Sequence, residues 1–131
     1  MKSLPKRVGV LWISLMMMAL PAMAADAPKV LNVLAVNVKG DQTAYLQRVK
    51  QLIAIQKRLE TGGTMRVWRA TLAGQNTDTI YVTVEFPNLE AFAKSMAKTQ
   101  ADEEWNKVVK ELDTSGLREV LSRSQLVEVT P

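Results

Sequence analysis

The chain has 131 residues with 17 Lys+Arg against 13 Asp+Glu, and its sequence contains neither cysteine nor histidine. This length predicts one small domain once an N-terminal signal is set aside. The missing residue types exclude disulfides, the usual zinc and copper sites, histidine-dependent catalytic triads and histidine-ligated haem. We therefore expect no metal site and no cofactor.

The first 24 residues have the three parts of an export signal. Three basic residues precede the apolar run of residues 8–20. The small residues Ala22 and Ala24 occupy the positions that signal peptidase recognises before its cleavage site. The run has 13 residues, fewer than the roughly 20 that a membrane-spanning helix needs. We therefore favour cleavage after Ala24 over an uncleaved anchor, which predicts a periplasmic domain of residues 25–131 without a membrane segment.

Removing the signal also removes most of the net positive charge. Three of the basic residues and none of the acidic residues lie in residues 1–24, which leaves 14 basic against 13 acidic residues. A strongly basic domain is the usual compositional sign of nucleic-acid binding. We therefore expect no nucleic-acid partner.

The mature chain begins with a β-rich segment, residues 30–40, that ends at a glycine. A helix is predicted over residues 41–60, because apolar side chains recur at helical spacing after Asp41, which can cap the first turn. Gly62 and Gly63 then supply the stop. The first half of the domain is therefore expected to be a strand followed by a helix.

The stretch "RVWRATLAGQNTDTIYVTVEF", residues 66–86, indicates two strands with a turn between them. Pro87 then breaks the strand, and Asn88 can cap a helix with an apolar stripe. A second helix is predicted to start at Asp102, which has two acidic residues directly after it. Residues 119–129 form the last predicted strand.

This order, β-α-β-β-α-β, is that of the ferredoxin-like arrangement. It predicts an α+β fold with one four-stranded antiparallel sheet and the helices on one face. The other face of such a sheet meets water, a ligand or a second sheet. The function of that second face is the main question that the sequence raises.

The separation of apolar from polar side chains predicts the register of the hairpin. With a loop at residues 74–78 and Ala73 opposite Thr79, the apolar side chains, Trp68 among them, share the face toward the helices. Trp68 is then a core residue. The second face carries the polar side chains Arg69, Tyr81, Thr83 and Glu85.

Two interpretations of the second face remain open. Arg69 and Tyr81 could bind a small anionic or aromatic metabolite, with Glu85 as a conceivable general base. Alternatively, the same side chains satisfy one another as a structural ion pair and hydrogen bond, which is the interpretation we favour. Arg123 on the last strand could join either arrangement.

The segment "VEFPNLEAFAKSMAKTQADEEWNKVVKEL" resembles the strand, helix, acidic break and aromatic-containing helix of the dimeric α/β-barrel superfamily. With the strand "VWRATLAG", it is most similar to the NIPSNAP-like and antibiotic-biosynthesis-monooxygenase-like groups, and residues 30–129 fit the layout. The resemblance implies a homodimer in which two sheets pack together, so that the second faces line a barrel.

Haem-handling members of that superfamily use a histidine ligand, which this sequence lacks. The cofactor-free oxygenases are similar to this chain in supplying Trp, Asn and Tyr. Whether Asn32 or Asn37 faces the barrel is open, because both alternations of the first strand are apolar. The resemblance leaves two hypotheses. We favour a small-molecule-binding or stress-related module without a catalytic site of known type. The alternative is a cofactor-free monooxygenase-like enzyme acting on a small aromatic metabolite.

Overall fold

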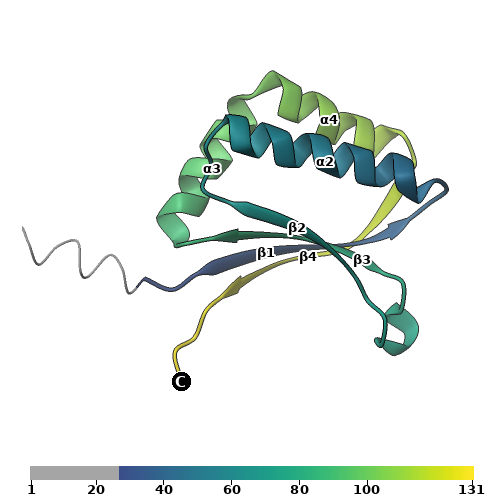
Figure 1. Ribbon diagram of the computed structural model, residues 1–131, viewed down its shortest axis with the longest axis horizontal. Coiled ribbons are helices and arrows are strands. Elements are labelled where there is room, and N and C mark those ends of the chain that lie inside the picture. Colours follow the sequence, from purple (N-terminus) through teal and green to yellow (C-terminus); the bar gives the residue numbers. More distant parts are fainter. Residues whose placement is uncertain (1–26) are drawn as a thin grey trace, which may run out of the picture.

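The computed structural model describes residues 27–131, so the predicted export signal lies outside the described residues. Its elements follow in the order β1 (Val30–Val38), α2 (Gln42–Arg58), β2 (Thr64–Arg69), the 3-10 turn η1 (Gly74–Asn76), β3 (Ile80–Phe86), α3 (Leu89–Ala101), α4 (Glu103–Thr114) and β4 (Arg118–Val127). The four strands form one antiparallel sheet in the order β2-β3-β1-β4. The three helices lie on one face of the sheet (Figure 1). The predicted ferredoxin-like fold is confirmed.

Polar side chains at the helix starts fix where each helix begins. Asp41, Asn88 and Asp102 cap α2, α3 and α4 by accepting a hydrogen bond from a backbone N–H of the first turn. Asp102 itself has an extended backbone, so α3 and α4 are separate helices, as predicted. Arg58 at the end of α2 donates to both carboxylate oxygens of Asp102 at 2.9 Å, which ties α2 to the start of α4.

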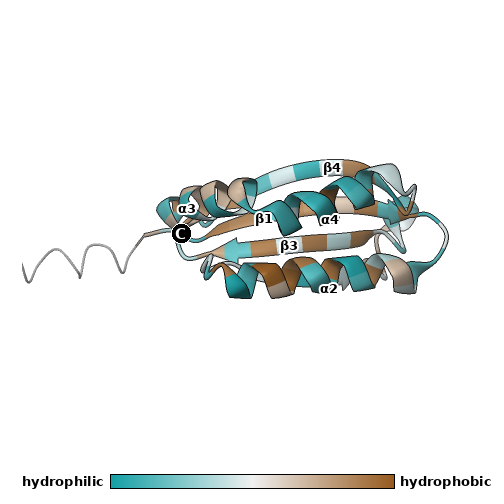
Figure 2. Ribbon diagram, turned by 90° about the horizontal axis from the view of Figure 1, so that it is seen from above, coloured by the Kyte–Doolittle hydropathy of each residue, from teal (hydrophilic) through white to brown (hydrophobic). Residues whose placement is uncertain are grey.

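The core lies between the helix layer and the sheet. The buried residues of α2 stand about one turn apart along the helix. Fully burying one apolar side chain stabilises the fold by about 1.5–3 kcal/mol. Figure 2 shows hydrophobic colour along β1 and β3 and hydrophilic stretches along α2 and α4. The buried cluster is made of Val36, Tyr45, Val49, Leu52, Ile55, Ile80, Val82, Val108 and Leu112.

The register between β2 and β3 differs from the predicted one. Trp68 lies opposite Tyr81 and Arg69 lies opposite Ile80, a shift of three residues. Because side chains alternate along a strand, an odd shift exchanges the two faces of β2. Arg69 therefore lies on the face toward the helices. Trp68 is 52% exposed on the other face, so the predictions of Trp68 as a core residue and of Arg69 on the second face are wrong.

The reason for the shift is the length of the turn. Ala70 and Thr79 close the hairpin, with the Ala70 N–H donating to the Thr79 carbonyl at 2.9 Å and the Asp78 N–H donating to the Ala70 carbonyl at 2.8 Å. Residues 71–78 form an excursion that contains η1 and a positive φ at Asp78. A loop of residues 74–78 would instead have extended β2 by three residues, to Ala73, with Thr79 still closing the hairpin on the side of β3.

A bulge in β4 changes the alternation of that strand. Its register to β1 shifts between Ala35 and Val36, and Leu121 is the extra residue. As a result, Arg118 before the bulge and Arg123 after it occupy the same face of the sheet, the one toward the helices.

Candidate functional site

The sheet face away from the helices, called the open face below, carries the predicted polar group with one member changed. Arg66 lies opposite Thr83 and diagonal to Tyr81 and Glu85. It therefore takes the position that was predicted for Arg69. The open face does carry an arginine, a tyrosine and a glutamate, but the arginine is Arg66 and not Arg69.

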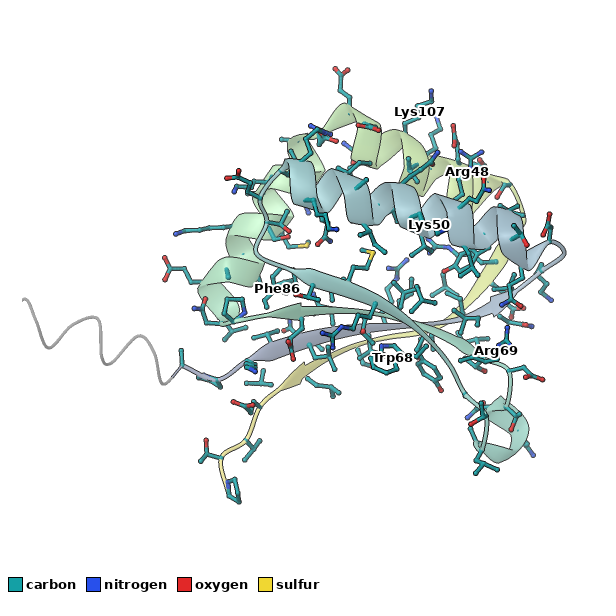
Figure 3. All side chains as sticks on the ribbon, viewed as in Figure 1. Arg48, Lys50, Trp68, Arg69, Phe86 and Lys107 are labelled. Carbon is teal, nitrogen blue, oxygen red and sulfur yellow. The ribbon has the colours of Figure 1, made fainter. Side chains whose placement is uncertain are left out.

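Trp68 is the largest side chain on the open face, and Figure 3 labels it on the side of the sheet without helices. Its indole Nε1 donates a hydrogen bond to Thr83 Oγ1 at 2.8 Å. Together with Leu31 and Val33 these residues border a groove of about 340 Å³. The open face is thus partly apolar, and its groove is smaller than the cavity described next.

A larger cavity, of about 600 Å³, lies between the helix layer and the sheet. Along α2 it is lined by Tyr45, Val49, Leu52 and Gln56, which stand on successive turns of the helix. At a rise of 1.5 Å per residue, Tyr45 and Gln56 are about 16 Å apart along the helix axis. The cavity is therefore elongated along α2.

The second helical wall runs in the opposite direction. The ion pairs Arg48–Glu111, at 2.8 Å, and Arg58–Asp102, at 2.9 Å, show that α4 is antiparallel to α2. Trp105, near the start of α4, therefore lines the cavity close to the C-terminal end of α2.

The cavity opens between α3 and β4. Met96 of α3 and the β4 residues Arg123 and Gln125 line it and are exposed. The Gln125 side-chain amide donates to Asn32 Oδ1 at 3.0 Å. Asn32 therefore lies on the helix side of the sheet and lines the cavity. The alternation of β1 places Asn37 on the open face.

Tyr45 and Arg118 lie together at the closed end of the cavity. Tyr45 is fully buried, and the Arg118 side chain is 6% exposed while one of its nitrogens pairs with Asp113 at 3.1 Å. Burial raises the pKa of the Tyr45 phenol, and the neighbouring guanidinium partly opposes this shift. The phenol is therefore protonated at neutral pH. The guanidinium lies close to the phenol, but within residues 27–131 neither Tyr45 Oη nor Arg118 Nε has a hydrogen-bond partner of regular geometry.

The charged residues that line the cavity are Arg118 and Arg123, and no Asp or Glu of the described chain lines it. No group of three or more metal-ligating side chains occurs in the described part either. In the same range, no helix is both long and apolar enough to cross a membrane. The cavity can thus hold an apolar body and offer hydrogen-bond donors and positive charge to it.

The predicted site residues are divided between the two faces of the sheet. On the open face lie Tyr81, Thr83 and Glu85, whereas Arg69 lies on the helix side outside the cavity and Arg123 lies at the cavity mouth. Sequence reasoning missed Tyr45 and Arg118. The phenol of Tyr45 within an apolar helical stripe was the one available signal.

Comparison with protein-family models gives no match, and comparison with curated proteins gives none either. Solved structures match in fold. A NIPSNAP family protein from Agrobacterium tumefaciens superposes with a TM-score of 0.58 at 15% identity, over 79% of this chain and 93% of that chain. A second A. tumefaciens NIPSNAP family protein, of unknown function, gives 0.57 at 19% identity, over 79% and 88%.

SnoaB, a cofactor-independent oxygenase from Streptomyces nogalater, superposes with a TM-score of 0.55 at 13% identity, over 79% of this chain and 94% of that chain. At these identities the likeness shows the fold. The chain has the ferredoxin-like fold shared by NIPSNAP-like proteins and this oxygenase, which confirms the predicted resemblance.

Proposed function

We propose that the protein is an exported, homodimeric small-molecule-binding domain whose ligand occupies the cavity between the helix layer and the sheet. The observation that carries this proposal is the cavity of about 600 Å³. Ligand pockets commonly measure roughly 300–1,000 Å³, whereas protein interiors otherwise contain few voids larger than a water molecule. The ligand thus lies on the opposite side of the sheet from the surface that the sequence indicated.

Native mass spectrometry of the exported protein, purified without denaturation, tests the binding function. The wild type should carry a co-purifying small molecule. Val109→Trp places a larger side chain on the cavity wall and should abolish that additional mass while circular dichroism shows a retained fold. Spectra without any bound molecule for both proteins would contradict a binding function.

The homodimer is proposed to form through the open face. That face carries exposed apolar side chains on both outer strands, with Trp68 at 52% and Leu126 at 54% exposure. Obligate dimers commonly bury about 2,000 Å² or more, which a contact over all four strands would supply. Light scattering at micromolar concentration should give the dimer mass, and a monomeric mass would contradict this part of the proposal.

Export rests on the pattern of residues 1–24. The intact mass of the protein recovered from the periplasm of a bacterial host should equal that of a chain beginning at Ala25. A mass that includes residues 1–24 would instead indicate an uncleaved anchor.

A cofactor-free oxygenase is the second candidate, and one observation favours it. Asn32, Tyr45 and Trp105 line one cavity, and these are the residue types that the resemblance to such oxygenases implies. The neighbour SnoaB is a cofactor-independent oxygenase of the same fold. Oxygen uptake with an electron-rich naphthol, without added metal or cofactor, tests this candidate. Uptake no faster than in a protein-free solution would remove it.

A further inference from the structure

Two polar atoms at the closed end of the cavity lack partners. Tyr45 Oη and Arg118 Nε are both buried and close together, and neither forms a hydrogen bond of regular geometry within residues 27–131. Buried side-chain donors are nearly always paired in folded proteins. Two such donors side by side, both lining one cavity, indicate a position built for an acceptor group.

We propose that the ligand is an amphipathic organic acid whose carboxylate accepts hydrogen bonds from Tyr45 Oη and Arg118 Nε. The inference rests on the proposed binding function and names the chemical class of the ligand. A guanidinium has donors only, and the protonated phenol can donate its hydrogen, so an anionic acceptor complements both.

The charge of the cavity supports an anion over a neutral acceptor. Arg118 and Arg123 line it without any lining carboxylate in the described chain. Asp113 pairs with Arg118, but its side chain is 55% exposed and does not line the cavity. Water screens the exposed carboxylate of this pair, so Asp113 compensates only part of the positive charge that Arg118 and Arg123 bring to the cavity.

The shape and lining of the cavity indicate the form of the rest of the ligand. From the closed end at Tyr45 the walls are formed mainly by apolar side chains, and they continue about 16 Å along α2. Phe92, Met96 and Trp105 surround the other end. A chain-like or aromatic hydrocarbon body fits this lining, with the acid group innermost.

Isothermal titration calorimetry of the exported protein with naphthoate, naphthamide, octanoate and octanamide tests the inference. Each acid should bind about tenfold or more tightly than its own amide, as expected for charge-assisted hydrogen bonds. Tyr45→Phe should reduce this preference, and Arg118→Gln should remove it. Arg69→Gln is the matched control, because Arg69 lies on the same sheet face outside the cavity.

Arg123→Gln makes the same change at the mouth and should leave the preference for acids intact. Loss of the preference in this variant, with retention in Arg118→Gln, would overturn the inference by placing the anion at the mouth. Equal binding of acids and amides would overturn it and leave the cavity function standing. Binding of none of the four probes would overturn both. If Arg118→Gln does not fold, Tyr45→Phe and Arg118→Lys decide the outcome.

Discussion

Removing the Tyr45 hydroxyl should stabilise the ligand-free protein. The side chain is fully buried in the core, and its Oη has no hydrogen-bond partner in residues 27–131. Tyr45→Phe keeps the ring and removes only this oxygen. A buried unsatisfied polar group costs about 1–3 kcal/mol, and an ordered water could offset part of that cost. We therefore expect the free energy of unfolding to rise by about 1 kcal/mol.

For a domain of this size, a change of about 1 kcal/mol corresponds to a rise of about 4 °C in melting temperature. Circular dichroism of ligand-stripped wild type and variant measures it. Both proteins must be at the same concentration, because bound ligand and dimer formation also raise the melting temperature. Tyr81→Phe is the control, since Tyr81 is only partly buried on the open face and should show no gain.

A lower melting temperature for Tyr45→Phe would refute this reasoning, because the hydroxyl would then be satisfied in the ligand-free protein. The combination expected here is higher stability with weaker binding of acids. Function and stability commonly oppose one another at a binding site in this way.

Three further predictions concern other elements. Asp102→Ala should lower the melting temperature by removing the cap of α4. Hydrogen bonds from a backbone N–H of α4 and a guanidinium of α2 hold the pKa of Asp102 below its usual 3.8, so this difference should be full above about pH 4 and shrink as pH falls through the folded-state pKa. Gly63→Ala places a Cβ 2.7 Å from the Phe86 ring, so urea denaturation should show a loss of about 1–3 kcal/mol; unchanged stability would contradict the close packing. Thr83→Glu buries a charge in the proposed interface and should yield monomers in light scattering, whereas Gln47→Glu on the exposed side of α2 should not.

The order of the elements could be predicted because its signals are local. Asp41, Asn88 and Asp102 each begin a helix within one residue of the expected position. The hairpin register depends instead on how the turn folds. A loop of residues 74–78 and the observed excursion both give alternating strands, and a difference of three residues exchanged Trp68 and Arg69 between the faces.

The cavity could not be predicted from the pattern of side chains. An apolar stripe indicates which side of a helix faces the core, but it does not indicate how closely the helix approaches the sheet. Tyr45 and Val49 therefore have the pattern of ordinary core residues although both line a cavity. The burial of Arg118 depends on where β4 starts beneath the helices, which is set by the path of the whole chain.

The bulge in β4 links the pairing of this strand to the chemistry of both sheet faces. Arg118 and Arg123 are five positions apart, an odd spacing that would place them on opposite faces of a regular strand. The extra residue, Leu121, cancels this odd spacing and brings both arginines to the cavity. If Leu121 were instead paired like its neighbours, with the start of β4 held in place, Arg123 would move to the open face and Leu126 would turn inward. A slip of one residue in the pairing of β4 with β1, without any substitution, would thus halve the number of cavity cations and remove an exposed leucine from the open face.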